Sequence, residues 1–160
     1  QFPYYPGTGA ATEIGRGEGT GYTVNVPLEA GATHADYDLV VREAVVPTLE
    51  RYCPDLVIVS AGFDAHQRDP LASMRVSTEG FATMVARLRD VAERCAGGRL
   101  VAVTEGGYDL QALNDCLDVT VQVLGGTGEA PPVVHGDAAR GREALATVSR
   151  ALGARWPGIY

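Results

Sequence analysis

The pattern of hydrophobic positions divides most of the chain into short strands and longer helices. Two uninterrupted apolar runs, at residues 56–59 and 100–103, begin the segments 56–61 and 100–104, which are followed by glycines and polar residues, whereas residues 22–28 alternate apolar and polar positions. Uninterrupted apolar runs are typical of strands in a parallel sheet covered on both faces, and alternation is typical of a strand with one polar face. We therefore expect three parallel strands.

Helical spacing of apolar residues fills the intervals between these strands. The spacing predicts helices over residues 37–52, 77–96, 110–124 and 137–152. Thr33 or Asp36 is expected to cap the first helix and Pro47 to kink or restart it, while Ser77 caps the second. Pro131-Pro132 predicts a surface connection. Strands that alternate with helices of this length predict an α/β fold, a parallel sheet with helices on both faces.

Length and composition set limits on function. A chain of 160 residues with 46% hydrophobic positions predicts one globular unit. The net charge of −7 argues against nucleic acid or an anionic membrane as a partner, and no apolar run approaches the length of a membrane span. Cys53, Cys95 and Cys116 are widely spaced. They are therefore expected to be reduced, buried thiols of a cytoplasmic protein, with neither a disulfide framework nor a structural zinc site.

Candidate chemistry gathers where the two apolar runs end. The first is followed by Asp64, His66 and Asp69, and the second by Glu105-Gly106-Gly107-Tyr108. Ligands of parallel sheets bind beyond the carboxyl ends of the strands, so Asp64 and Tyr108 are expected at the same edge. Taken alone, an acid at a strand end such as Asp64 is more often a loop or helix-cap residue than a metal ligand. Asp64 and His66 at alternate positions also form a workable oxygen and nitrogen pair for zinc.

Four blocks of the sequence, in order, carry a family resemblance. They are FPYYPGTG, GRGEGTGYTVNVPL, SAGFDAHQRDPL and VTEGGYDL, and the match covers roughly residues 2–125. The chain resembles the zinc-dependent deacetylase superfamily of class II type histone deacetylases, acetylpolyamine amidohydrolases and acetoin-utilisation proteins. His66 and the EGGY sequence are nearer to class II and the polyamine and acetoin branches than to class I. The resemblance implies an arginase/deacetylase-type fold, of which residues 1–160 are the C-terminal portion of a single deacetylase domain.

The resemblance also implies roles for individual residues. Asp64 corresponds to one of three zinc ligands, and His66 to a residue that is not a ligand. Tyr108 corresponds to the tyrosine that donates a hydrogen bond to the acetyl carbonyl. Further matching positions are the substrate-channel residues Leu71, Gly106 and Gly107, and Tyr22, whose backbone carbonyl corresponds to a ligand of a structural K⁺ or Na⁺. We expect Asp69 to shape the channel loop through backbone hydrogen bonds.

The family's other two zinc ligands and its catalytic His-His pair have no counterpart here, because His34 and His135 lie in unrelated contexts and are expected to be solvated loop residues. The resemblance implies a zinc-dependent deacetylase acting on acetyl-lysine or acetylated polyamines. Without a partner that supplies the N-terminal half of the domain, this chain should be inactive. A second copy of the chain is another possible partner.

Two other functions remain open. One is a non-catalytic or degenerate deacetylase-like interaction domain. The other is a nucleotide-binding α/β protein that uses the glycine-rich residues 1–21, although such a loop would be expected after a strand and not before one.

Overall fold

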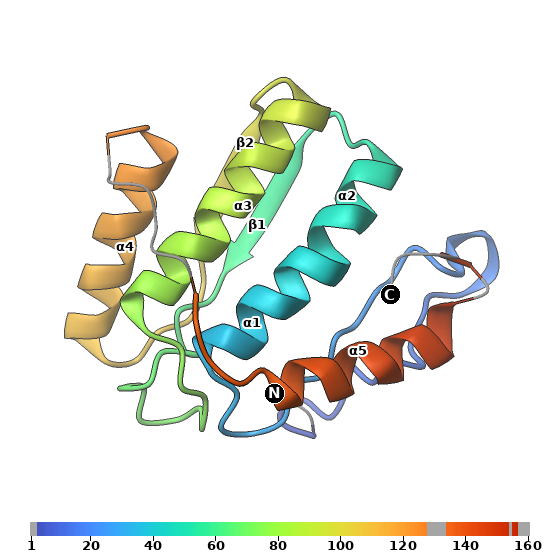
Figure 1. Ribbon diagram of the computed structural model, residues 1–160, viewed down its shortest axis with the longest axis horizontal. Coiled ribbons are helices and arrows are strands. Elements are labelled where there is room, and N and C mark those ends of the chain that lie inside the picture. Colours follow the sequence, from blue (N-terminus) through green and yellow to red (C-terminus); the bar gives the residue numbers. More distant parts are fainter. Residues whose placement is uncertain (1–2, 128–133, 154, 157–160) are drawn as a thin grey trace.

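Two parallel strands and a layer of helices form the centre of the fold (Figure 1). The computed structural model describes residues 3–127, 134–153, 155 and 156. Strand β1 (Val57–Ala61) pairs in parallel with β2 (Leu100–Thr104), with the first residues of the two strands opposite each other and likewise the last. Helix α3 (Thr78–Ala96) connects them and packs against the sheet, with its axis running along the strands. The α/β class with a parallel sheet is confirmed.

The two faces of the sheet have different surroundings. Val57, Val59 and Leu100 pack against Ala92 and Ala96 of α3. On the opposite face, the exposed fractions are 65% for Ile58, 49% for Val101 and 49% for Val103. An uninterrupted apolar run supplies hydrophobic side chains to both faces, because successive residues of a strand point in opposite directions. Within the described part of the chain, helices cover only the first of these faces.

The helix predicted over residues 37–52 begins earlier and has a break inside it. Helix α1 (His34–Val40) continues through a π-helical turn, η2 (Val41–Val45), into α2 (Val46–Tyr52). Pro47 lies in the first turn of α2, where a residue without an N–H group is tolerated, so the predicted restart is confirmed. The start is displaced because Thr33 donates both its backbone N–H (2.8 Å) and its hydroxyl (3.0 Å) to Asp36 Oδ2.

The strand predicted over residues 22–28 is wrong. The segment follows a short 3₁₀ helix, η1 (Gly17–Gly19), and is extended without pairing to either strand of the described sheet. The alternation of apolar and polar residues in this segment reflects packing against a helix. The apolar face packs against helix α5 (Ala139–Leu152), with Val24 and Val26 beside Val148 and with Leu28 beside Ala144.

The remaining helix predictions are confirmed, with small shifts of their ends. Ser77 caps α3 by accepting a hydrogen bond from the N–H of Gly80 (3.2 Å). Helix α4 (Leu110–Leu124) begins with Asp109, which accepts from the N–H of Ala112 (2.7 Å). The predicted helix over residues 137–152 begins at Ala139. The connection at Pro131-Pro132 lies outside the described residues.

Long-range contacts attach α5 to α1. The Asp36 carboxylate, buried in α1, accepts a hydrogen bond from the N–H of Gly141 at 2.9 Å. A Cβ at Gly141 would lie only 2.8 Å from the backbone oxygen of Asp36, so a glycine is required for this close approach. Burial disfavours the charged form of Asp36, but the hydrogen bonds from Thr33 and Gly141 outweigh that effect and lower its pKa.

The three cysteines are free, and their burial differs from the expectation. Cys116 is buried, as predicted, but Cys95 is partly exposed and Cys53 is exposed. Cys53 ends α2 in the left-handed backbone region (φ 53°), which places its side chain at the surface. In the part of the chain that the structure describes, no helix has both the length and the hydrophobicity to cross a membrane.

Candidate functional site

Asp64 and Tyr108 lie in adjacent loops at one edge of the sheet. β1 and β2 end opposite each other, at Ala61 and Thr104. Backbone pairing then continues past the strands, from the N–H of Glu105 to the carbonyl of Ala61 (3.0 Å) and from the N–H of Phe63 to the carbonyl of Gly106 (2.8 Å). The loops that follow the two strands therefore run side by side, and the prediction that both residues emerge at the same edge is confirmed.

Glycines give the Asp64 side chain its place between these loops. A Cβ at Gly62 would lie 3.0 Å from Asp64 Oδ1, and one at Gly106 would lie 3.2 Å from Asp64 Cγ. The Asp64 carboxylate thus lies against the backbone of two residues that have no side chain, Gly62 and Gly106. Gly107 has φ 132°, a conformation that favours glycine, and it also packs closely against Phe63. These glycines allow the two loops to approach each other.

The carboxylate of Asp64 has unused hydrogen-bonding capacity. It is partly exposed, and among the described residues none forms a hydrogen bond or an ion pair with it. A carboxylate in this state suits one position in the ligand set of a zinc ion. Catalytic zinc takes three protein ligands. The described residues contain no group of three or more His, Cys, Asp or Glu side chains that could hold a metal, so Asp64 fits zinc as a single ligand only.

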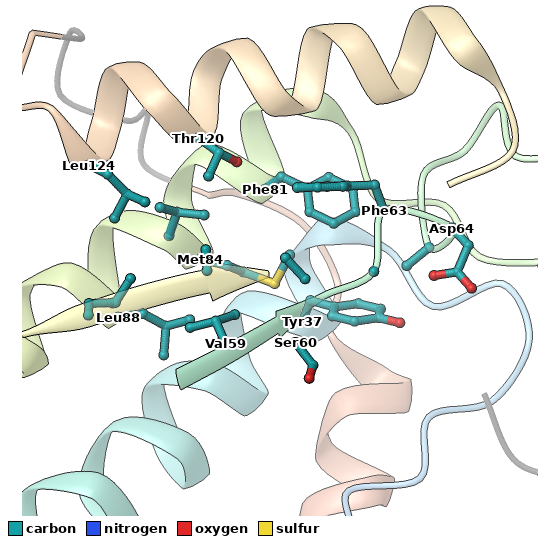
Figure 2. Close-up of a pocket in the computed structure, with 16 residues that line it drawn as sticks. Tyr37, Val59, Ser60, Phe63, Asp64, Phe81, Met84, Leu88, Thr120 and Leu124 are labelled. Carbon is teal, nitrogen blue, oxygen red and sulfur yellow. The ribbon is translucent and has the colours of Figure 1, made fainter. Parts of the chain in front are cut away.

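A cavity of about 280 Å³ extends from Asp64 between the sheet and the helices (Figure 2). Its walls are mainly apolar and include Val59 from β1, Leu88 from α3 and Leu124 from α4. Tyr37 of α1 also lines it, and Figure 2 shows the hydroxyl of Tyr37 at the same end of the cavity as the Asp64 carboxylate. Burial, with a further contribution from the negative charges of Asp64 and Asp36, raises the pKa of Tyr37 to about 12. Its phenol therefore stays protonated at neutral pH.

Sequence reasoning missed Tyr37. It counted this residue among the apolar positions of a helix, and nothing local in the sequence places it beside Asp64. The two are brought together by packing of α1 beneath the loop that follows β1.

Asp69 joins the two loops. Its Oδ1 accepts hydrogen bonds from the N–H groups of Leu71 (2.9 Å) and Ala72 (3.1 Å), and its Oδ2 accepts from the N–H of Tyr108 (2.8 Å). The carbonyl of Leu71 accepts a hydrogen bond from the hydroxyl of Tyr4 (3.0 Å). The prediction that Asp69 shapes its loop through backbone hydrogen bonds is confirmed, and the bond to Tyr108 is an addition that the sequence did not indicate.

Leu71 and Tyr108 both present their side chains to solvent at this edge. Their exposed fractions are 56% and 57%. The phenol of Tyr108 has no hydrogen-bond partner among the described residues, so it is available to a ligand. Catalytic and channel roles for these residues stay predictions.

His66 is a buried structural residue. Its Nδ1 accepts a hydrogen bond from the N–H of Arg68 (3.2 Å), so the neutral ring carries its proton on Nε2, which lies 3.3 Å from Thr78 Oγ1. The ring stacks on Phe81, with centroids 6.3 Å apart. Neither ring nitrogen is free to bind a metal, and the structure does not bring His66 and Asp64 together as a ligand pair.

The remaining candidates lie elsewhere. The ring of Tyr22 packs edge-on against Tyr52, the last residue of α2 (centroids 6.2 Å apart), near the opposite end of the sheet from Asp64. Its predicted role in binding a monovalent cation stays a prediction. His135 is exposed, as expected, whereas His34 is the first residue of α1 and not a loop residue.

Comparison with known proteins gives consistent matches. A family model described as the histone deacetylase domain matches residues 1–124. A histone deacetylase-like amidohydrolase from Pseudomonas aeruginosa is 43% identical over 125 residues, which are 78% of this chain and 33% of that protein. The polyamine deacetylase HDAC10 from Homo sapiens is 38% identical over 148 residues, which are 92% of this chain and 21% of that protein.

A solved structure extends the match to three dimensions. The crystal structure of the HDA15 HD domain superimposes with a TM-score of 0.85 at 35% identity, covering 98% of this chain and 42% of that one. The overall fold is therefore similar to part of a histone deacetylase domain. The chain spans less than half the length of each of these relatives.

Proposed function

The chain belongs to the histone deacetylase family, and from that premise we propose that it carries part of the active site of a zinc-dependent deacetylase. The substrates would be acetyl-lysine or acetylated polyamines. The observation that carries this proposal is the position of Asp64 and Tyr108 in adjacent, hydrogen-bonded loops at one edge of the sheet. The names of two relatives, a histone deacetylase-like amidohydrolase and a polyamine deacetylase, support the choice of substrate class.

Asp64 and Tyr108 have different tasks in this mechanism. Asp64 would hold zinc as one ligand; bound zinc supplies a Lewis acid that polarises the acetyl carbonyl. The exposed phenol of Tyr108 donates a hydrogen bond to the carbonyl oxygen as negative charge develops there, which stabilises the transition state more than the bound substrate.

The substrate channel would be formed by the same two loops. Leu71 offers an exposed apolar surface to the methylene chain of a lysine or polyamine, and Gly106 and Gly107, which directly precede Tyr108, would contribute their backbone to the channel wall. The net charge of −7 favours the approach of cationic amine substrates.

A further polypeptide segment is part of the proposal. Ile58, Val101 and Val103 form an exposed apolar face on the two-stranded sheet, and a contiguous exposed apolar surface often marks a site where other structure packs. We propose that residues 1–160 are the C-terminal portion of a deacetylase domain. The rest of the domain would cover this face and supply the other zinc ligands and the general base.

The same exposed face supports a second candidate, a non-catalytic interaction domain that binds a partner through Ile58, Val101 and Val103. The two candidates differ in metal content and in turnover.

Zinc analysis and a deacetylation assay test the proposal. The intact mass of the protein purified from its source defines the natural polypeptide, which is expected to contain one zinc and to hydrolyse acetyl-lysine peptides or acetylated polyamines. The isolated 160-residue chain should show neither property when Zn²⁺ is added. A natural polypeptide without zinc and without turnover would favour the interaction domain. Zinc-dependent turnover by the isolated chain would show that no further segment is needed.

A further inference from the structure

We propose that Asp69 is the positioning residue for Tyr108, holding its backbone so that the phenol faces the substrate channel. This inference rests on the proposed function, in which Tyr108 acts on the substrate. The two residues are 39 positions apart and belong to different loops, yet the N–H of Tyr108 donates to Asp69 Oδ2 at 2.8 Å.

The Asp69 carboxylate is also held by hydrogen bonds within its own loop. Asp69 Oδ1 accepts from the N–H groups of Leu71 and Ala72, which fixes the orientation of the carboxylate within its own loop. Oδ2 is then directed toward the neighbouring loop. The carboxylate therefore links the backbone of Leu71, the predicted channel residue, to the backbone of Tyr108, the predicted catalytic residue.

The Tyr108 backbone needs such a restraint because two glycines precede it. Gly106 and Gly107 have no Cβ, and Gly107 adopts φ 132°, so the backbone entering Tyr108 has unusual conformational freedom. The Tyr108 side chain is 57% exposed, so packing restrains it little. Displacement of a catalytic group by about 1 Å can lower a rate about 100-fold, which makes a fixed backbone position valuable here.

The carboxylate is ionised under ordinary conditions. Partial burial opposes ionisation, but the hydrogen bonds from the N–H groups of Tyr108, Leu71 and Ala72 lower the pKa of Asp69 below its usual value. An ionised oxygen forms a stronger hydrogen bond with an N–H group than a neutral one does.

A neighbouring contact provides a matched control. Arg68 Nη2 lies 3.0 Å from Asp109 Oδ1 and also joins the two loops, but both side chains are partly exposed to solvent. Ion pairs of this kind contribute little to stability. Arg68→Gln removes this second link and leaves the bond between Asp69 and Tyr108 in place.

Amide hydrogen exchange in the natural polypeptide tests the contact directly. Asp69→Asn leaves only one acceptor oxygen and turns an NH₂ group toward one of the three donors. The Tyr108 amide should then exchange at least about 10-fold faster than in the wild type, whereas Arg68→Gln leaves its rate unchanged. Equal Tyr108 exchange in wild type and Asp69→Asn, with the α3 amides protected in both, overturns the proposal. If Asp69→Asn does not fold, Asp69→Glu provides the comparison, because it keeps the charge but displaces the oxygens.

Kinetics of the natural polypeptide separate positioning from loop structure. Asp69→Asn should lower kcat by about 10- to 100-fold with little change in KM, and it should cause no further loss in a Tyr108→Phe background. A raised KM with unchanged kcat, or an equal loss in both backgrounds, overturns the proposal, because Asp69 would then act independently of Tyr108. If Tyr108→Phe alone retains full kcat, the proposed function fails instead, whatever the exchange experiment shows.

Discussion

The Asp64 carboxylate lies against the backbone of Gly106, so closely that a Cβ at Gly106 would be 3.2 Å from Asp64 Cγ. Gly106 belongs to the loop that ends at Tyr108. The two predicted active-site loops are therefore matched in shape, because the space left by a missing side chain on one loop is used by the carboxylate of the other.

Gly106→Ala should impair the site and spare the fold. The atoms nearest to the new methyl group belong to the flexible Asp64 side chain, so the free energy of unfolding should fall by less than about 1 kcal/mol. The carboxylate must move by a few tenths of an ångström. In the natural polypeptide, zinc content or kcat should then fall by at least about 10-fold.

Denaturant unfolding and metal analysis measure the two effects of Gly106→Ala separately. Gly19→Ala is the control, because a Cβ at Gly19 meets no atom within 4 Å. Unchanged zinc content and unchanged kcat in Gly106→Ala would contradict the prediction.

Asp36→Asn should destabilise the chain by about 2–4 kcal/mol, because the buried carboxylate accepts hydrogen bonds from Thr33 and from Gly141 of α5. An asparagine offers one acceptor oxygen where the aspartate uses two. Urea unfolding gives the change in free energy. Asp137→Asn, at an exposed ion pair with Arg142, is the control and should cost less than about 1 kcal/mol.

The pH dependence gives a second measurement on Asp36. Its folded pKa lies below the ordinary value of 3.8, so its stabilising contribution is complete above pH 3.8 and is lost as the pH falls through that value toward the folded pKa. The wild type should therefore lose its advantage over Asp36→Asn on acidification. A constant difference in unfolding free energy between pH 6 and pH 3 would be inconsistent with this assignment.

His66 should make the fold sensitive to mild acid. Burial, followed by the charge of Arg68, lowers the pKa of His66 below 6.5, although the acidic groups Asp109, Asp115 and Glu79 oppose the shift. Above pH 6.5 the imidazole is neutral in both folded and unfolded chains. As the pH falls below 6.5, the unfolded chain binds the proton first, so the free energy of unfolding decreases until the pH passes the folded pKa.

A series of unfolding experiments between pH 8 and pH 5 measures this slope. His66→Gln should flatten it, whereas His135→Gln, at an exposed histidine, should retain it. A wild-type slope that survives in His66→Gln would assign the effect to another group.

The parts of the fold that were predictable are those encoded locally. The apolar runs that became β1 and β2, and the capping residue Ser77, act over a few neighbouring positions. The alternation at residues 22–28 shows an extended segment with one apolar face, but it does not reveal whether a strand or a helix covers that face. In the structure the neighbour is α5.

The candidate site was predictable to the same extent. Residue types and glycine breaks pointed to Asp64 and Tyr108, since both follow directly from the strand ends. The bond between Asp69 and Tyr108 and the position of Tyr37 depend on which loops and helices become neighbours. Such contacts leave no periodic signal in the chain, because they arise only from its three-dimensional packing.

The roles proposed for Asp64 and Tyr108 predict different failures in the natural polypeptide. Asp64→Asn replaces a charged oxygen ligand with a neutral amide and should strip or weaken the zinc, with loss of turnover as a consequence. Tyr108→Phe removes only a hydroxyl group, on an exposed side chain, that has no hydrogen-bond partner among the described residues, so zinc and substrate binding should be nearly retained. Its kcat should fall by about 10² to 10³, the usual scale for removal of one donor to a developing oxyanion.

Metal analysis of both variants, combined with steady-state kinetics on an acetyl-lysine peptide or an acetylated polyamine, distinguishes these failures. Unfolding experiments on the isolated chain provide the control. Tyr108 is exposed and its hydroxyl makes no hydrogen bond within the described residues. Tyr108→Phe should therefore leave the free energy of unfolding within about 0.5 kcal/mol of the wild type. A full complement of zinc in Asp64→Asn would exclude Asp64 as a ligand. Full kcat in Tyr108→Phe would remove the phenol from the mechanism, and the edge where the two loops meet would then need another catalytic group.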